Sequence, residues 1–293
     1  MGAACPWCGA EVSAPDLDGF TVVRCPACRT GITWPVPTES ELDAAYGEWY
    51  RPQEGRFSGP GDRVLRWTRS TLARRLNKTA PPGRILDVGA GDGTLVGALR
   101  AIGRDALGLE RTGTGPFVMS GEVGDVGGQL SAIVFWHSLE HLRQPAVTLR
   151  DAVALLQPLG VLVVAVPNYN SLQAQLFGDR WFALDMPRHL VHLDSGTLVA
   201  RLEELGLRVQ RESYVRGGQL VFGWMHGLVC CLPGHPDLHD ALRRPTARNE
   251  PLSRPRLILA VLAALCLSPV ALVASVIEVA LRRGGTVYVE ARR

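Results

Sequence analysis

The stretch Asp87-Val88-Gly89-Ala90-Gly91-Asp92-Gly93 decides the fold of this 293-residue chain. The residues before it, 84–86, predict a short buried strand, and the residues after it, 94–100, predict the start of a helix. Glycine lacks a Cβ atom and tolerates positive φ, so a glycine-rich turn between a strand and a helix lets a ligand approach the backbone closely. The spacing is G-x-G-x-G, whereas the dinucleotide fingerprint is G-x-G-x-x-G, and Thr94 stands where its third glycine would fall. The turn therefore predicts a nucleotide ligand and departs from the dinucleotide pattern.

The segment that follows narrows the range of possible nucleotide ligands. Residues 106–110 predict a second strand that ends in the acidic residue Glu110. Strand, turn, helix, strand and acidic residue in this order resemble motif I of the class I S-adenosylmethionine (SAM)-dependent methyltransferases. In that family the turn wraps the methionine part of SAM, and the acidic residue holds the ribose hydroxyls. The resemblance implies that SAM contacts the turn and the carboxylates beside it: Asp87, Gly89, Gly91, Gly93 and Glu110.

The resemblance also implies the fold class. It is an α/β, Rossmann-like class I methyltransferase with a mixed seven-stranded sheet whose last strand is antiparallel. Residues 81–215 would form the SAM-binding core. Residues 284–293 (Gly-Gly-Thr-Val-Tyr-Val-Glu-Ala-Arg-Arg) would form the final strand, between the strands predicted at 160–167 and 207–215.

The segment after the fourth predicted strand, 132–136, reads His137-Ser138-Leu139-Glu140-His141-Leu142. It resembles the corresponding motif of small-molecule methyltransferases, in which the backbone at Trp136 and His137 faces the SAM sulfonium. Glu140 and His141 are interpreted as a metal pair, as a catalytic pair, or as part of a structural turn.

Only about 20 residues separate the second predicted strand from the fourth, where the family usually has a helix and a strand. Residues 117–119 are expected to form a short third strand. Asp125 is the candidate for the acidic contact near the adenine, and Glu122 is an equal candidate.

A loop rich in aromatic and basic residues follows the fifth predicted strand. Pro187-Arg188-His189 resembles the Pro-x-His of the family's substrate loop. Methyl transfer from a sulfonium requires alignment of the nucleophile and removal of one proton. Since a histidine titrates near neutrality, His189 is the predicted general base, with His141 as the second catalytic candidate. The alternative is that His189 only holds the loop through hydrogen bonds.

Four cysteines near the N-terminus form two C-x-x-C pairs, Cys5/Cys8 and Cys25/Cys28. Two such pairs at this spacing supply the four soft ligands that tetrahedral zinc requires. The sequence therefore predicts a structural zinc ribbon over 1–36, and a recognition role for it stays open.

Residues 37–80 are expected to form a helical linker or lid. Thr38 and Glu41 form a capping box that opens a short helix, and a basic helix is predicted over 62–78 with its arginines in solvent. The aromatic residues between the two helices cover the SAM pocket or pack the ribbon onto the core: Tyr46, Trp49, Tyr50 and Phe57.

Residues 216–283 are predicted to form an apolar helical insertion. The uncharged run 257–277 is long enough to read as a transmembrane helix by itself. A single crossing would, however, leave the final strand on the wrong side of the bilayer, and both flanks are basic. The prediction is two helices broken near Pro269 that contact one leaflet through 257–282. The alternatives are a buried cap and a single transmembrane anchor.

Composition and charge limit the classes of function that the chain can have. The formal net charge of +3 is too small to argue for nucleic acid, and no signal-peptide pattern opens the chain, so a cytoplasmic location is expected, peripheral or monotopic at the inner face of the membrane. The first hypothesis is a SAM-dependent methyltransferase acting on a small or lipid-linked acceptor. The others are a zinc-ribbon RNA methyltransferase and a non-enzymatic scaffold with a SAM-type fold.

Overall fold

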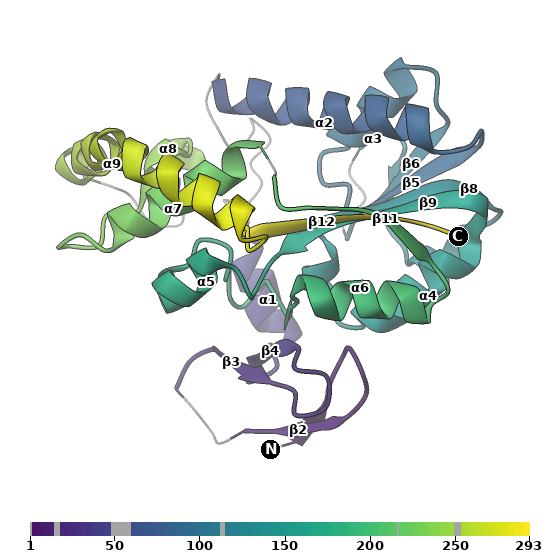
Figure 1. Cartoon of the computed structure of the whole chain (residues 1–293), viewed down its shortest axis with the longest axis horizontal. Coiled ribbons are helices and arrows are strands. Elements are labelled where there is room, and N and C mark those ends of the chain that lie inside the picture. Colours follow the sequence, from purple (N-terminus) through teal and green to yellow (C-terminus); the bar gives the residue numbers. More distant parts are fainter. Residues whose placement is uncertain (1, 15–17, 48–59, 112–114, 216, 249–252) are drawn as a thin grey trace.

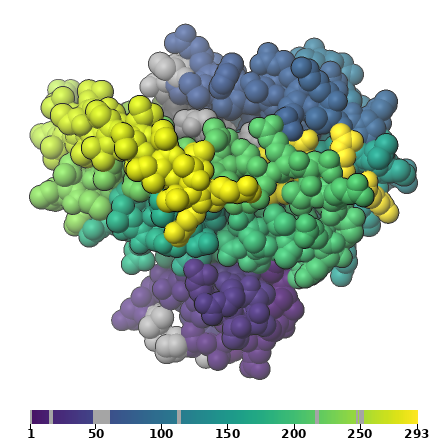
Figure 2. Space-filling model, in the orientation of Figure 1, coloured from purple at the N-terminus to yellow at the C-terminus, as the bar shows by residue number. Residues whose placement is uncertain are grey.

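The computed structural model describes residues 2–14, 18–47, 60–111, 115–215, 217–248 and 253–293. A central sheet carries helices on both faces, a small β module lies below it, and a helical extension projects to one side (Figure 1). Figure 2 shows the β module, in purple, as a lobe of its own against the core.

The central sheet has seven strands in the order β11-β12-β9-β8-β5-β6-β7. All strands are parallel except β12, which runs antiparallel to both of its neighbours, β9 and β11. The predicted fold class and the place of the last strand are thereby confirmed. The bounds are β5 Arg84–Val88, β6 Ala106–Leu109, β7 Val118–Met119, β8 Leu130–Trp136, β9 Leu156–Pro167, β11 Arg208–Ser213 and β12 Thr286–Arg292.

Helices cover both sides of this sheet (Figure 1). On one side, α2 (Pro60–Thr79) and α3 (Thr94–Ala101) share a core with β5 and β8. On the other side, α4 (Pro145–Leu155) and α6 (Ser195–Glu204) bury leucines against the sheet. Short 3₁₀ turns lie at η1 (Val123–Asp125), η2 (Leu139–His141) and η3 (Gly178–Arg180).

The basic face of α2 does not lie wholly in solvent, contrary to the prediction. Arg75 Nε donates to Glu290 Oε2 at 2.6 Å, and Glu290 is buried on β12. The guanidinium of Arg69 lies over the ring of Trp136, 4.9 Å from its centroid. Two of the arginines therefore tie α2 to the sheet, because a buried carboxylate and an aromatic face both favour a cation.

The N-terminal module contains two small sheets. Strands β1 (Gly2–Ala4) and β2 (Glu11–Ser13) form a hairpin. Strands β3 (Thr21–Arg24) and β4 (Gly31–Trp34) form the second sheet together with β10 (Val191–His192), which belongs to the core. Helix α1 (Glu39–Ala45) follows with the predicted capping box between Thr38 and Glu41. One small sheet therefore contains strands from the N-terminal module and from the core.

The helical extension consists of α5 (Leu172–Phe177), α7 (Gly217–Cys230), α8 (Leu238–Leu242), the 3₁₀ turn η4 (Pro245–Ala247) and α9 (Arg254–Ala280). Small residues of α9 form the buried stripe that packs against α7 and α8: Ala260, Ala264, Ala271 and Ser275.

Helix α9 is continuous through Pro269, so the predicted break at this residue is wrong. Proline has no N–H to donate to the carbonyl four residues before it, which would leave Leu265 O without its helical donor. The side chain of Ser268 replaces that donor, since its Oγ donates to Leu265 O at 2.8 Å.

Candidate active site

The three glycines of the turn between β5 and α3 adopt left-handed backbone conformations. Their φ angles are 78° for Gly89, 61° for Gly91 and 72° for Gly93. A Cβ atom on Gly89 would lie 2.3 Å from the Cβ atom of Ser138, which follows β8. The turn therefore requires glycine both for its backbone conformation and for its packing against the next strand of the sheet.

Two carboxylates flank the turn, as the sequence predicts. Glu110 follows β6, and its Oε2 accepts a hydrogen bond from Gly91 N at 2.6 Å. Asp87 lies on β5 and is 5 % exposed. Burial raises the pKa of Asp87 to about 7, although the nearby guanidinium of Arg69 opposes this rise.

His137 stands at the carboxyl end of β8, beside the turn. Its φ of 52° is unusual for a residue with a side chain. Its backbone N donates to Ala165 O of the neighbouring strand, and its Nδ1 lies 3.3 Å from Glu140 Oε1. The backbone between Trp136 and Ser138 is thus fixed next to the glycine turn.

Glu140 is the centre of a histidine cluster. Its side chain is buried, and ligand atoms of Glu140, His141 and His189 lie within 4.8 Å of one another. Burial by itself would raise the pKa of Glu140, but the surrounding imidazoles, that of His137 foremost, hold it below its ordinary value. Burial lowers the pKa of His141 to about 4, so His141 is neutral at pH 7. The arrangement is compatible with two of the interpretations of Glu140 and His141, a catalytic pair and a pair of metal ligands.

His189 has a fixed orientation within this cluster. Its Nδ1 donates to the carbonyl oxygen of Ala183 at 2.9 Å, which leaves the lone pair on Nε2 when the ring is neutral. Nε2 lies 3.9 Å from Glu140 Oε1 and 3.8 Å from Asp185 Oδ2. The ring nitrogen that would accept a proton therefore faces two carboxylates.

Asp185 and Arg188 belong to the site and were missed by the sequence reasoning. Arg188 contacts the Asp185 carboxylate through both Nε and NH2, and its NH1 donates to Ala45 O at the end of α1. Burial would raise the pKa of Asp185, but His189 and Arg188 lower it to about 2. The spacing of Asp185 and His189, four residues apart in one loop, is the sequence signal that could have identified the pair.

The predicted lid is described only in part. Tyr46 lies after α1 with its hydroxyl 2.9 Å from His141 Nδ1, so this aromatic residue contacts the cluster. Trp49, Tyr50 and Phe57 lie outside the described residues.

On the adenine side of the predicted pocket, Asp125 is exposed and caps η1. Its Oδ2 accepts a hydrogen bond from Glu122 N at 2.9 Å. Both candidates for the adenine contact are thus part of one short turn that follows β7.

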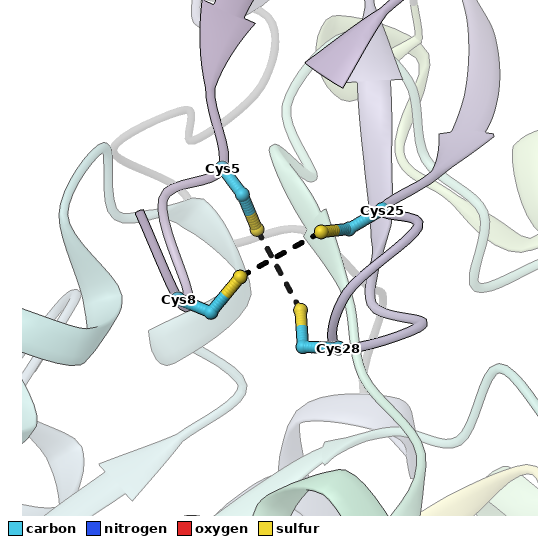
Figure 3. Close-up of side chains that lie close together, drawn as sticks. All are labelled: Cys5, Cys8, Cys25 and Cys28. Atoms are coloured by element: carbon cyan, nitrogen blue, oxygen red, sulfur yellow. Dashed lines mark hydrogen bonds between the residues drawn. The ribbon is translucent and has the colours of Figure 1, made fainter. Parts of the chain in front are cut away.

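The four cysteines of the N-terminal module meet at one point, with their sulfur atoms directed toward one another (Figure 3). The Sγ atoms of Cys5 and Cys28 are 3.7 Å apart, and those of Cys8 and Cys25 are 3.6 Å apart. Tetrahedral zinc with Zn–S bonds of ~2.3 Å sets its sulfur ligands ~3.8 Å apart. The cluster therefore fits a zinc ion.

Comparison with known proteins gives a match to one family model and several similar solved structures. A family model described as "methyltransferase domain" matches residues 63–212. A SAM-dependent methyltransferase from Archaeoglobus fulgidus is similar at a TM-score of 0.44 and 17% identity, over 77% of this chain and 94% of that chain. Magnesium protoporphyrin IX methyltransferase from Synechocystis, with bound S-adenosylhomocysteine, is similar at a TM-score of 0.44 and 15% identity, over 61% of this chain and 89% of that chain.

The [4+2]-cyclase SpnF is similar at a TM-score of 0.45 and 16% identity, over 86% of this chain and 90% of that chain. The search of curated proteins finds no match. The family model covers about half of the chain and includes the glycine turn, Glu110 and the histidine cluster. The chain therefore belongs to the methyltransferase-domain family and has the fold of a class I SAM-dependent methyltransferase.

Proposed function

We propose that this protein transfers the methyl group of SAM to a small or lipid-linked acceptor at a membrane surface. The observation that carries this proposal is the position of the turn. Its glycines and Glu110 lie at the carboxyl end of the parallel strands, where open α/β sheets bind ligands, and the cluster around Glu140 follows the adjacent strand.

The proposal gives a role to each residue that is predicted to contact SAM. Glu110 would accept from the ribose hydroxyls after its contact with Gly91 N is exchanged, and Asp87, buried on β5 before the turn, would lie near the methionine part. The backbone at Trp136 and His137 would face the sulfonium, with Asp125 or Glu122 beside the adenine. Bound SAM supplies an electrophilic methyl group, so the residues of this chain have to align the acceptor and take its proton.

We assign the role of general base, which takes the proton of the acceptor, to His189, with His141 beside it as the second candidate. The carboxylates of Glu140 and Asp185, 3.9 and 3.8 Å from His189 Nε2, would stabilise by their negative charge the imidazolium that forms. His141 is neutral at pH 7 because it is buried. It therefore adds no positive charge that would oppose protonation of His189.

The test is a substitution of the predicted base. His189→Asn should lower methyl transfer from radiolabelled SAM into a cell extract by about 100-fold or more, while the Kd for SAM in isothermal titration stays within about twofold. His235→Asn, at an exposed histidine far along the chain, is the matched control. A large loss of SAM affinity in His189→Asn would instead place this residue in the cofactor site.

A metal ion is the alternative occupant of the same cluster. Two imidazoles and one carboxylate form a ligand set used for divalent transition metals. Elemental analysis of the purified protein separates the two assignments. More than one metal ion per chain, with the excess lost in Glu140→Gln, would make His189 a ligand rather than the base.

The membrane contact rests on the exposed face of α9. Only 17% of its most apolar 18-residue window is buried, which differs from the core helix of a soluble protein. Arginines stand at both ends, at positions 254 and 256 and at 282 and 283, where they would contact anionic headgroups. The apolar side chains about half exposed or more include Leu259, Leu262, Leu265, Leu272, Val273 and Val276.

The contact would be one-sided. Helix α9 leads into β12, which pairs with β9 and β11 inside the sheet. Its other end packs against α8, and α7 lies along it. A single crossing would require the last ten residues to leave the sheet, so a helix lying in one leaflet fits these connections better.

Flotation with vesicles of phosphatidylcholine and anionic phosphatidylglycerol tests this part. The wild type should float with the vesicles, and the double variant Leu262→Glu/Val276→Glu should not. Leu159→Glu, which changes a leucine 64% exposed at the start of β9, should float like the wild type. A wild type that stays in solution and shifts RNA in a gel would favour an RNA methyltransferase, and absence of SAM binding would leave only a scaffold.

A further inference from the structure

The loop that carries His189 is shared between the core and the N-terminal module. Residues Val191 and His192 form β10, which pairs with β4 in the register Val191↔Ile32 and His192↔Gly31. The backbone N of Thr33 donates to Leu190 O at 3.1 Å. Since β4 lies between β3 and β10, the module supplies two of the three strands in the sheet that holds this loop.

The side chain of Thr33 reaches His189 itself. Thr33 Oγ1 donates to the carbonyl oxygen of His189 at 2.5 Å and lies 2.9 Å from His192 Nε2. A hydroxyl has a single proton, so His192 Nε2–H is the donor in the second contact. Thr33 is 1% exposed and His192 is 5% exposed. Loss of the hydroxyl would leave buried polar groups unpaired on both residues.

Strand β4, which carries Thr33, begins directly after the cysteine cluster. Cys25 N donates to Thr30 O at 2.9 Å, and Cys28 Sγ lies 3.3 Å from Thr30 Oγ1. Gly31 follows at once, and a Cβ atom there would lie 2.9 Å from the Cβ atom of His192. Four residues thus separate Cys28 from Thr33, and the backbone of β4 pairs with that of β10 along this path.

The core holds the opposite side of the loop. Leu190 N donates to the carbonyl oxygen of Glu140 at 2.8 Å, in the turn that carries the centre of the cluster. His189 therefore stands between two anchors. One is the carbonyl of Glu140, and the other is β4 of the cysteine module.

We propose that the N-terminal module is a positioning element for His189, with Thr33 as the positioning residue. Metal binding by the four cysteines orders β4, and β4 in turn holds the His189 backbone so that Nε2 stays between Glu140 and Asp185. The consequence for methyl transfer rests on the proposed function, whereas the coupling of metal binding to the order of residues 189–192 does not.

Three variants of the full chain test the role of Thr33. Thr33→Val removes the hydroxyl and keeps the branched shape, Thr33→Ser restores the hydroxyl, and Thr21→Val makes the same change on the outer strand β3. Hydrogen–deuterium exchange of residues 189–192 should accelerate about fivefold or more in Thr33→Val, the effect of one lost hydrogen bond. It should stay near the wild-type rate in Thr33→Ser and Thr21→Val.

The same variants separate positioning from general damage. With zinc content and the SAM Kd unchanged, Thr33→Val should lower kcat and move the pH profile of methyl transfer, and Thr33→Ser should restore both. If Thr33→Val does not fold, removal of zinc from the wild type by a chelator tests the coupling, because exchange at 189–192 should then rise and fall again when zinc is returned.

Unchanged exchange at residues 189–192, both in Thr33→Val and after zinc removal, would overturn the coupling. A protein that shows the coupling but transfers no methyl group from SAM would overturn the proposed function and leave the coupling intact. Accelerated exchange with unchanged kcat and pH profile would show that the contact is structural only, and would overturn the positioning role.

Discussion

The carboxylate of Glu110 accepts a hydrogen bond from the backbone N of Gly91 at a distance of 2.6 Å. The residue after the second strand of the domain is thereby held against the glycine turn that follows the first strand, 19 positions earlier. The other oxygen of this carboxylate, Oε1, accepts a hydrogen bond from Arg111 N at 3.1 Å, so backbone N–H groups of the turn and of the chain after β6 both hold Glu110 in place.

Glu110→Ala should weaken SAM binding by about 10- to 100-fold, because a charge-assisted contact of a carboxylate is worth ~1.5–3 kcal/mol. Isothermal titration measures the change. Glu203→Ala, at an exposed carboxylate on α6, is compared in the same way. Equal loss in the two variants would show that general negative charge, rather than the position of Glu110, controls affinity.

Gly89→Ala should destabilise the protein by several kcal/mol and abolish SAM binding. The new Cβ atom would meet Ser138 Cβ at 2.3 Å in a backbone conformation that alanine rarely adopts. Gly97→Ala is the matched control, because no atom lies within 4 Å of a Cβ there and alanine favours the helix by about 1 kcal/mol. Thermal melts of both variants decide the point. A tolerant Gly89→Ala would contradict the packing described for the turn.

The buried carboxyl of Asp87 should make stability depend on pH. Its pKa is raised from 3.8 to about 7 in the folded protein, so the folded state binds the extra proton. The associated stability is fully present below pH ~4 and is lost as the pH rises through about 7, with an upper limit of ~4 kcal/mol.

Asp87→Asn removes this titration. Thermal melts at pH 5 and pH 8 should show the variant gaining stability relative to the wild type as the pH rises. A difference between the two proteins that is the same at both pH values would show that Asp87 ionises normally.

Cys5→Ser should release zinc from the N-terminal module and unfold it, since a module of this size needs the metal for folding energy. The wild type should contain one zinc per chain by elemental analysis, or more if the Glu140 cluster also binds metal. Cys231→Ser, at an exposed cysteine after α7, should keep the wild-type content. A wild type with less than about half a zinc per chain would contradict the ribbon.

Glu278→Leu should destabilise the helical extension by about 2–4 kcal/mol, because it leaves buried donors without an acceptor. The carboxylate accepts from Gln173 N at 3.1 Å, from Gln173 Nε2 at 2.8 Å and from Trp224 Nε1 at 2.8 Å. Glu203→Leu, on the exposed side of α6, should change stability by less than about 0.5 kcal/mol. Chemical denaturation measures both, and equal effects would remove any special role for Glu278.

The sequence was sufficient for the buried parallel strands β5, β8 and β9 because each of them carries a local signal. The apolar runs of β5, β8 and β9 and the glycines at 89, 91 and 93 fixed the order of strand, turn and helix. The position of β12 followed from the family resemblance and is confirmed by its pairing with β9 and β11.

Other features depend on contacts that no local pattern reports. The two residues of β10 are too few to show strand periodicity, and their partner β4 lies about 160 positions earlier. The rule that proline breaks a helix failed at Pro269 because a neighbouring serine supplies the missing donor. Arg75 is one of several arginines on α2, and only the fold shows that it meets Glu290 on β12.

The place of β12 also has a consequence for biosynthesis. This strand fills the gap between β9 and β11, yet the ribosome makes it after both of them and after the whole of α9. The sheet therefore stays in two parts, with β11 apart from the parallel strands β9, β8, β5, β6 and β7, until β12 has been made.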